Sequence, residues 1–201
     1  MKIISKCTFN FIIYHNMAII VGSAFKKIYG NVFYKILNDS LSHIGFTYKF
    51  GENIDTMSFD FNDGRGGLHF TTLENLWIFR SFGNLVAKIN IDDDDFVMCY
   101  EDDTEFKVHK LTIIEIIPFM DFINSDIVIS LSCVKFDGLM LKYIQKQTPE
   151  ICLESILQND RALYFIEEQI YIDCIEYVKQ NKMKSIEKQT LDVISNILNN
   201  A

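Results

Sequence analysis

Two stretches near the carboxyl end of the chain decide its fold: Met140–Asn159, MLKYIQKQTPEICLESILQN, and Ala162–Asn181, ALYFIEEQIYIDCIEYVKQN. An offset of 22 residues, from position 140 to position 162, superposes them. The identities at this offset are Leu141 with Leu163, Ile144 with Ile166, Gln147 with Gln169, Cys152 with Cys174, Glu154 with Glu176, and Gln158-Asn159 with Gln180-Asn181. A fixed short period is typical of stacked helical repeats, because one unit cannot bury its apolar face alone.

Each unit carries the signals of a helix. Thr148-Pro149-Glu150 places a hydroxyl at the N-cap, proline at the first helical position and an acid in the first turn. An apolar stripe at helical spacing follows, and it comprises Ile151, Leu153, Ile156 and Leu157. Asn159 suits the end of this helix, and Ala162–Ile166 begins a shorter second one.

Two weaker copies flank the clear pair, Asp126–Gly138 upstream and Gln189–Val193 downstream. The sequence therefore predicts a short α-helical repeat array, solenoid-like, over residues 123–201. Cys152 and Cys174 share one register, and we interpret them as small core residues. We also expect five aromatic residues of the array to form packing layers: Tyr143, Tyr164, Phe165, Tyr171 and Tyr177.

Residues 33–122 have a different sequence pattern, in which short β-branched and aromatic runs alternate with turn signals. The predicted strands are Phe33–Leu37, Phe46–Phe50, Met57–Phe61, Leu68–Thr72, Leu85–Ile91, Phe96–Tyr100 and Phe106–Ile113. A helix is predicted over Leu73–Phe82, capped by Thr71 or Thr72, with Trp77 facing inward and Gly83-Asn84 ending it. The predicted fold class is α+β, a small mixed domain followed by the helical repeats.

Residues 1–32 form an apolar, basic leader with a net charge of +4, from Lys2, Lys6, Lys26 and Lys27. The run Phe9–Phe25 suggests a signal sequence or membrane anchor, with a possible cleavage site at Gly22-Ser23-Ala24. Polar residues interrupt the run, which is shorter than the roughly 20 residues that a span needs. Two alternatives stay open, a helix or strand packed on the body and a non-native extension upstream of Met17. Membrane contact is expected only through residues 1–30.

Charge and cysteine content limit the function classes. The whole chain has a net charge of −8, so the part after residue 32 carries −12. Such an acidic body is unsuited to nucleic acid, because phosphate binding needs clustered lysine and arginine. The 5 cysteines are widely spaced and form no CxxC pair, which gives a zinc knuckle no scaffold. Reduced thiols in an intracellular compartment are the simplest interpretation.

The densest local motif is the glycine-rich stretch Asn62-Asp63-Gly64-Arg65-Gly66-Gly67-Leu68-His69-Phe70. Glycine-rich turns can hold phosphate, but the P-loop pattern with its lysine is absent. A tight turn with glycines at positive φ is the favoured interpretation. The alternative is a ligand site in which Arg65 grips an anion beside Gly66, Gly67 and His69. A second cluster, Asp92–Asp95 with the acids of residues 101–105, lacks the calcium-loop spacing and is interpreted as solvated turns. No metal site and no cofactor are predicted.

A family resemblance rests on several short motifs in order: Phe33-Tyr34-Lys35-Ile36-Leu37-Asn38, His43–Lys49, Gly51–Asp55, Gly66–Thr71, Val86–Asp95 and Phe106–Leu111. Together they resemble an amino-terminal domain of uncharacterised mimivirus-type giant-virus proteins, over residues 33–115. That domain often precedes ankyrin repeats, whereas the QTPEICL-type segments here look like a second giant-virus repeat class. Leu68-His69-Phe70 stands where Leu-Tyr-Phe is typical, and residues 1–30 lie outside the likeness. The resemblance implies no established activity.

Two functions follow as hypotheses. In the favoured one, the chain is a non-enzymatic interaction module whose repeats bind a host or viral protein, in the host cytoplasm or the virion. In the other, it is an enzyme or binder for a phosphorylated or nucleotide ligand at the Gly64–Gly67 turn. The two are distinguished by whether Arg65, His69 and an acid meet in a pocket.

Overall fold

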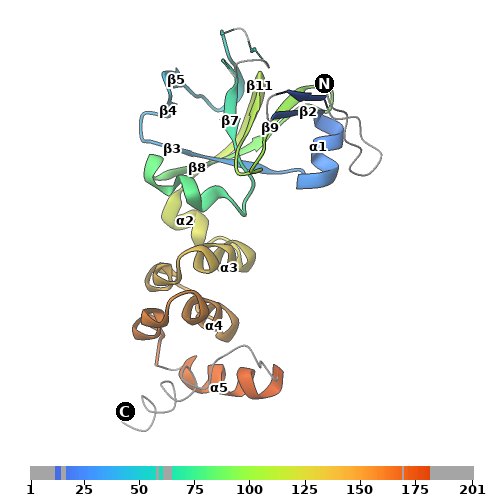
Figure 1. Ribbon diagram of the computed structural model, residues 1–201. Coiled ribbons are helices and arrows are strands. Elements are labelled where there is room, and N and C mark those ends of the chain that lie inside the picture. Colours follow the sequence, from blue (N-terminus) through green and yellow to red (C-terminus); the bar gives the residue numbers. More distant parts are fainter. Residues whose placement is uncertain (1–11, 15–16, 58, 61–64, 169, 182–201) are drawn as a thin grey trace. The chain divides into compact units, whose positions relative to one another are not determined.

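The computed structural model describes residues 12–14, 17–57, 59–60, 65–168 and 170–181, and it confirms an α+β chain. Two compact units make up the chain, Met1–Phe119 and Met120–Ala201. The division lies three residues before the predicted end of the mixed domain at 122. Strands dominate the first unit and helices the second (Figure 1).

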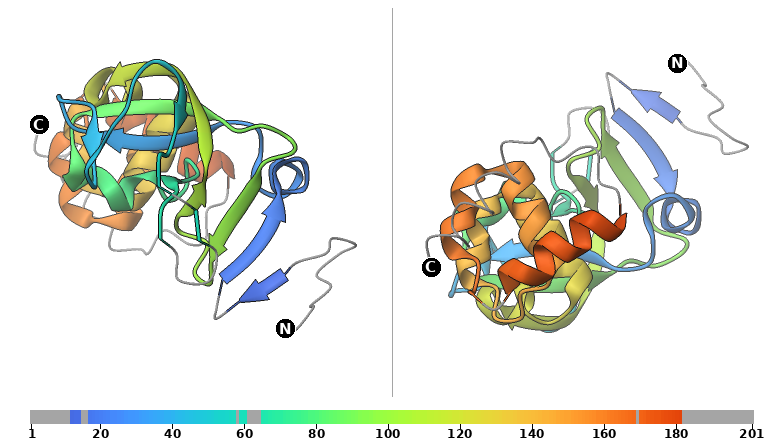
Figure 2. Two further views of the ribbon diagram at one scale, coloured as in Figure 1. Left: turned by 90° about the horizontal axis from the view of Figure 1, so that it is seen from above. Right: turned by 90° about the horizontal axis from the view of Figure 1, so that it is seen from below.

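Two antiparallel sheets make up the described part of the first unit (Figure 2). One sheet has the order β1-β2-β9-β10-β7. Its strands are β1 (Ile12–Tyr14), β2 (Met17–Val21), β9 (Phe96–Tyr100), β10 (Phe106–Val108) and β7 (Leu68–Phe70). The other sheet has the order β3-β8-β11-β6. Its strands are β3 (Phe33–Leu37), β8 (Leu85–Asn90), β11 (Lys110–Pro118) and β6 (Gly51–Ile54), and β4 (Ser42–His43) and β5 (Phe46–Thr47) form a separate hairpin.

An aromatic cluster occupies the core of this unit. The Phe25 ring centroid lies 5.1 Å from that of Phe33 and 4.7 Å from that of Phe106, and the Phe33 and Phe70 centroids lie 5.3 Å apart. All four rings are buried and come from distant parts of the chain. Aromatic pairs in such tilted arrangements add roughly 0.5–1.5 kcal/mol each beyond the burial of their area.

Residues 17–29 of the predicted leader belong to this core. Strand β2 pairs with β9 along its whole length, and α1 (Gly22–Tyr29) buries Phe25 completely. This arrangement agrees with the alternative of an element packed on the body. Residues 1–11 of the proposed anchor lie outside the described residues, and no helix in the described part is long and apolar enough to cross a membrane.

The acidic turn Asp92–Asp95 holds the start of α1. The Gly22 N–H donates to the carbonyl of Asp95 at 2.7 Å, and the Ser23 N–H donates to that of Asp93 at 2.8 Å. The Asp93 carboxylate also pairs with Lys26 at 2.8 Å, and that of Asp92 pairs with Lys110. The turn therefore satisfies backbone donors at the helix start, a role beyond that of the solvated loop predicted.

Most predicted strands are present, with two informative differences. β3 and β9 have the predicted bounds, whereas the run Phe106–Ile113 divides at His109 into β10 in one sheet and β11 in the other. The apolar alternation changes phase at this point, from Phe106 and Val108 to Leu111 and Ile113, and the predicted single strand overlooked this shift. The strand predicted over residues 57–61 is not formed at residues 57, 59 and 60, and residues 58 and 61 lie outside the described part.

The helix predicted over Leu73–Phe82 is a shorter 3₁₀ helix, η1 (Leu76–Phe82), in which Trp77 is buried as expected. The predicted threonine cap is wrong, because the Thr71 hydroxyl donates to the Thr104 carbonyl at 2.6 Å and Asn75 occupies the N-cap position. Gly83 ends the helix with extended backbone. A Cβ there would lie 2.0 Å from the Leu37 carbonyl oxygen, so close approach requires this glycine.

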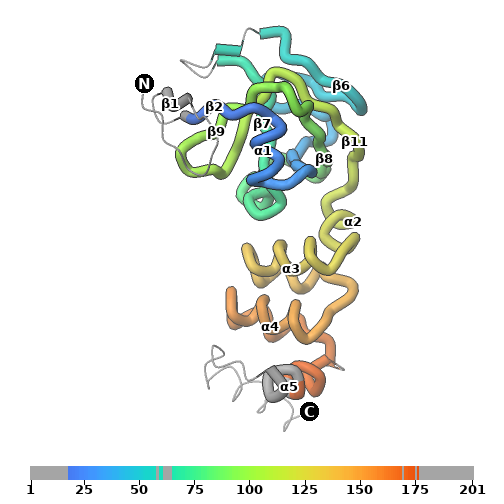
Figure 3. Tube along the Cα trace, turned by 90° about the vertical axis from the view of Figure 1, so that its right-hand side faces the viewer, coloured from blue at the N-terminus to red at the C-terminus, as the bar shows by residue number. Residues whose placement is uncertain are grey.

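The second unit alternates α-helices with 3₁₀ helices. After α2 (Phe119–Ile123), which begins at the boundary, come α3 (Ile127–Phe136), η2 (Gly138–Tyr143), α4 (Pro149–Gln158), η3 (Asp160–Phe165) and α5 (Ile170–Asn181). Helix α4 packs against both α3 and α5, and η2 packs against η3 (Figure 3). The fourth repeat copy, at residues 189–193, lies outside the described residues.

Caps recur at the predicted 22-residue offset. Thr148 Oγ1 accepts the Ile151 N–H at 3.3 Å and Pro149 follows it, as the sequence predicted. The side chain of Asp137 caps η2 at 3.0 Å, and Asn159, 22 residues later, caps η3 at 3.1 Å. Each cap satisfies a backbone donor that would otherwise lack a partner in the first turn.

Three side-chain amides each bridge a backbone carbonyl and the N–H two residues later, and we call them amide brackets. Asn124 spans the Tyr143 carbonyl (3.1 Å) and the Gln145 N–H (2.7 Å). Gln147 makes the same contacts one unit later, with Phe165 (2.8 Å) and Glu167 (3.0 Å). Gln158 closes the turn from α3 into η2, between the Phe136 carbonyl (3.0 Å) and the Gly138 N–H (2.6 Å).

The predicted interior of the second unit is confirmed for the cysteines and wrong for three of the five aromatic residues. Cys152 and Cys174 are fully buried, as are Ile151, Leu153 and Ile156 of the predicted stripe, although Leu157 is exposed. Among the predicted packing layers, Tyr143, Tyr164 and Phe165 are exposed by 42%, 79% and 37%. Tyr171 is partly buried and its hydroxyl donates to the Leu163 carbonyl at 3.0 Å, whereas the side chain of Tyr177 is not described.

Candidate functional site

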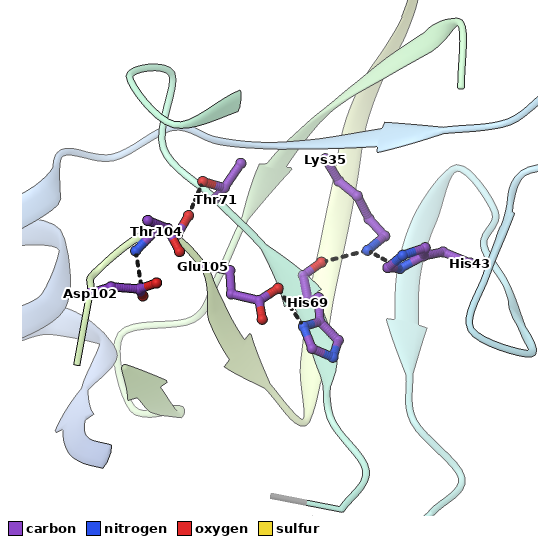
Figure 4. A network of polar contacts seen from close by, with 7 residues as sticks. All are labelled: Lys35, His43, His69, Thr71, Asp102, Thr104 and Glu105. Carbon is purple, nitrogen blue, oxygen red and sulfur yellow. Dashed lines mark hydrogen bonds and ion pairs between the residues drawn. The ribbon is translucent and has the colours of Figure 1, made fainter. Parts of the chain in front are cut away.

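A buried lysine on β3 is the centre of the polar cluster in the first unit. All five residues of β3 are buried, and Lys35 is only 4% exposed. Its Nζ donates to the carbonyl of His69 at 2.8 Å and lies 3.0 Å from His43 Nδ1 (Figure 4). Among the described residues no carboxylate pairs directly with it. A charged amine in such a position is costly, because burial removes its hydration.

Burial accordingly shifts the titration of this cluster. Desolvation lowers the pKa of Lys35 to about 7, although the nearby Glu105 carboxylate opposes the shift. Desolvation first, and then the nearby Lys35 and His69, lower the pKa of His43 to about 4. At neutral pH the His43 ring is therefore uncharged and Lys35 is only partly protonated.

A histidine–carboxylate pair completes the cluster. His69 Nδ1 lies 3.0 Å from Glu105 Oε2, and this hydrogen bond is the main cause of the lowered pKa of Glu105. The neighbouring Thr104 is fixed by the Thr71 hydroxyl and by the pairing of β7 with β10. With an ionised carboxylate as partner, Nδ1 of His69 carries the proton, so Glu105 sets the orientation of this ring.

These polar groups line a pocket of about 290 Å³ whose walls are mainly apolar. The walls include Phe79 and Phe82 from η1 and Ile44 from the β4–β5 hairpin. The complete lining is Tyr34, Lys35, Ile36, His43, Ile44, His69, Phe70, Thr71, Phe79, Phe82 and Glu105. An apolar cavity with a few convergent polar groups is the usual form of a small-molecule site.

Of the predicted ligand residues, only His69 lines this pocket. Gly66 and Gly67 have φ values of 67° and 83°, which confirms a turn that needs glycine. The Gly67 N–H donates to Asp55 Oδ2 at 2.6 Å. Arg65 is 71% exposed at its side chain and lies 3.7 Å from Asp60. Gly64 lies outside the described residues, so the predicted anion site is only partly described.

Sequence reasoning missed the partners of His69. Lys35 and His43 lie 34 and 26 positions before it and Glu105 lies 36 positions after it, so no local motif links the four. One signal was present, a lysine inside the otherwise apolar strand FYKIL. Such a lysine can be recognised as buried only once the strand is known to be covered on both faces.

A second candidate site is the aromatic surface of the second unit, which we define as Tyr143, Tyr164 and Phe165. Tyr143 and Phe165 occupy equivalent positions, since their carbonyls accept from the brackets of Asn124 and Gln147. Tyr143 and Phe165 are the last residues of η2 and η3, which pack against each other. The Lys142 ammonium lies 4.6 Å from the centre of the Tyr143 ring. Exposed large apolar side chains in one part of a surface are typical of binding sites.

Comparison of the chain with protein-family models, curated proteins and solved structures finds no match. The resemblance to giant-virus proteins and the intracellular location therefore stay predictions. Within the described ranges, no group of three or more His, Cys, Asp or Glu side chains is placed to hold a metal ion. Function must be argued from the pocket and the aromatic surface themselves.

Proposed function

We propose that the chain is a non-enzymatic protein-binding module and that its second unit is a short, solenoid-like helical array. The recurrence at the 22-residue period of the caps, and of the backbone groups that the brackets of Asn124 and Gln147 contact, supports the array. In such arrays each unit contacts its neighbours, and the exposed side chains at equivalent positions form the binding surface.

The observation that carries this proposal is the exposure of the aromatic surface. Tyr164 is 79% exposed, and Tyr143 and Phe165, which occupy equivalent positions, are both exposed. Tyrosine is enriched at protein interfaces because it combines a large apolar ring with a hydroxyl that can stay hydrated. The partner that fits is a protein face with apolar side chains and hydrogen-bond acceptors.

The local charges favour a mixed rather than a strongly basic partner. Lys142 and Arg161 are exposed on η2 and η3, and Asp160 and Glu167 are exposed beside them. The two signs are interspersed, so specificity comes from the aromatic side chains, and charges at the rim adjust the association rate.

A matched pair of variants tests the proposal. The first replaces Tyr143, Tyr164 and Phe165 by serine, and the control replaces the exposed Phe50 and Phe96 of the first unit by serine. We expect a protein that co-purifies with the wild type and the control but is lost from the first variant. With that protein purified, its affinity should fall by at least about 30-fold, the equivalent of one or more interface hot spots. Equal recovery with all three chains would contradict the proposal.

Binding of a phosphorylated or nucleotide ligand at the Gly64–Gly67 turn stays a second, weaker proposal. Its anion would have to compete with Asp60 for Arg65, and Arg65 does not line the pocket that contains His69. Calorimetric titration with inorganic phosphate and ATP, with Arg65→Gln as the comparison, tests it. Saturable binding that Arg65→Gln abolishes would favour this function.

A further inference from the structure

The pocket around Lys35 combines three features that belong together chemically: a buried amine, apolar aromatic walls and a histidine–carboxylate pair. Figure 4 shows the Lys35 ammonium group between the His43 ring and the backbone of His69, with Glu105 against the far side of the His69 ring. None of these groups is needed for binding at the aromatic surface of the second unit.

The geometry at Lys35 Nζ leaves room for a reaction. A tetrahedral nitrogen has four directions, of which one is the bond to Cε and two are taken by the His69 carbonyl and His43 Nδ1. Among the described residues none accepts a hydrogen bond in the remaining direction, the centre of the Tyr48 ring lies 4.9 Å from Nζ, and Lys35 is part of the pocket lining. Both contacts are with uncharged acceptors, so neither demands the ammonium form as a carboxylate would.

The walls and charges select the class of ligand. Phe79 and Phe82 give the pocket aromatic walls that suit an apolar ring, and about 290 Å³ suits a single ring with a small substituent. An anionic ligand would be repelled by the Glu105 carboxylate, which lies in the same lining. A neutral carbonyl compound meets no such repulsion.

We propose that this pocket binds a small aromatic aldehyde and that Lys35 Nζ forms an imine with its carbonyl carbon. The lone pair of Nζ forms the N–C bond, the carbonyl π pair moves to oxygen, and oxygen gains the proton that nitrogen loses. In the second stage the nitrogen lone pair forms C=N as the C–O bond breaks, and the oxygen leaves with a proton as water. The net change is amine plus aldehyde to imine plus water, with no oxidant or reductant.

The polar residues of the cluster each have a role in forming the imine. The lowered pKa of Lys35, about 7, supplies unprotonated amine at neutral pH, as for other lysines in apolar pockets. The His69 ring, oriented by Glu105, is a positioning and proton-transfer group in the same lining. His43, with its pKa lowered to about 4, stays neutral and holds Nζ in place.

Reductive trapping tests the proposal directly. The full chain is incubated at pH 7 with benzaldehyde and cyanoborohydride, and the modified lysines are identified by peptide mass spectrometry. Because an exposed lysine with an ordinary pKa is almost entirely protonated at pH 7, we expect Lys35 to react about 100-fold faster per site. Benzyl alcohol, which fits the pocket without reacting, should slow the modification of Lys35 alone.

Three controls keep the result decisive. Lys35→Met should remove the fast adduct, whereas Lys88→Met, on the neighbouring strand β8, should leave it unchanged. Unfolding in urea should abolish the preference for Lys35 in the wild-type chain, which needs no variant to fold. Modification that follows exposure, with Lys135 and Lys142 first, or a Lys35 that stays unmodified in the folded chain, would overturn the proposal.

Discussion

The two units of the chain bury their apolar side chains through different kinds of contact. In the first unit, β2 pairs with β9 and β3 with β8, so its core joins residues that are far apart in the sequence. In the second, helices contact neighbours one repeat away and the turns are closed by amide brackets. Non-local pairing produces a pocket lined by a buried lysine, whereas local stacking leaves aromatic side chains on the outside. The first arrangement suits chemistry and the second suits binding.

The largest expected effect is on the non-local core. Phe25→Ala removes a fully buried ring at the centre of the aromatic cluster, and we expect the free energy of unfolding to fall by about 3–5 kcal/mol. Trp77, the only tryptophan of the chain, is buried in the first unit and reports its unfolding by fluorescence in urea.

The matched control is Phe50→Ala, at a ring that is 69% exposed, which should change the free energy by less than about 0.5 kcal/mol. Far-UV circular dichroism would follow the helices of the second unit at the same time. If the two units are independent, the helical transition stays in place when the Trp77 transition moves. If both transitions shift together, the two units unfold cooperatively and do not differ in how they are stabilised.

The next effect is a pH dependence of the first unit that arises from Lys35. The folded-state pKa of Lys35 is lowered to about 7 from an ordinary 10.5, so between these values the unfolded chain binds more protons. Stability therefore rises with pH above 7, at up to about 1.4 kcal/mol per pH unit, and the gain is complete near pH 10.5. Below pH 7 both states are protonated and the cost of the buried charge is fully present.

Urea unfolding at pH 7, 8 and 9, followed through Trp77, measures this slope. Lys35→Met should abolish it, and Lys88→Met should retain it. A wild-type slope that is flat, or that falls over this range, would show that Lys35 is protonated in the folded chain with an ordinary pKa.

A smaller effect is expected from the local contacts of the second unit. Gln147→Met removes the bracket to the Phe165 carbonyl and the Glu167 N–H while keeping most of the side-chain volume. We expect a loss of about 1–2 kcal/mol, because both groups are near water and can be partly hydrated. The helical dichroism transition should move and the Trp77 transition should not, with the exposed Gln145→Met as a control.

The smallest expected effect on stability comes from the aromatic surface. Tyr164→Ala removes a ring that is 79% exposed, so the free energy of unfolding should change by less than about 0.5 kcal/mol. Partner binding, by contrast, should weaken strongly in the same variant. A destabilisation above about 2 kcal/mol would show that Tyr164 serves packing after all, as the sequence first suggested.

How much could be predicted from the sequence also differs between the units. The 22-residue repeat, the Thr148 cap and the buried Cys152 and Cys174 were predictable because they depend on neighbours in sequence. The exposed Tyr143 and Phe165 were not, because 3₁₀ helices turn in three residues and shift the apolar face away from the α-helical stripe.

In the first unit the individual strands were predictable and the site was not. The aromatic and apolar runs Phe33–Leu37 and Phe96–Tyr100 predicted strand type and bounds, but strand order depends on pairings across the whole domain. His69 was identified as a candidate, yet its contacts with Lys35 and Glu105 exist only through those pairings. The residues of a short strand such as β10 do not by themselves show which sheet it joins.

The amide brackets have a consequence for how the second unit tolerates insertions. The Asn124 side chain reaches 21 residues ahead to the Gln145 N–H, whereas the longer Gln147 side chain reaches 20 residues ahead to the Glu167 N–H. Each bracket closes a turn with a side chain of fixed length. An extra residue inside η2 or η3 would therefore move the carbonyl and N–H groups of the turn beyond the reach of the side-chain amide. The bracket thereby limits the length of the segment between its two ends, and insertions that leave these contacts intact must fall outside that segment.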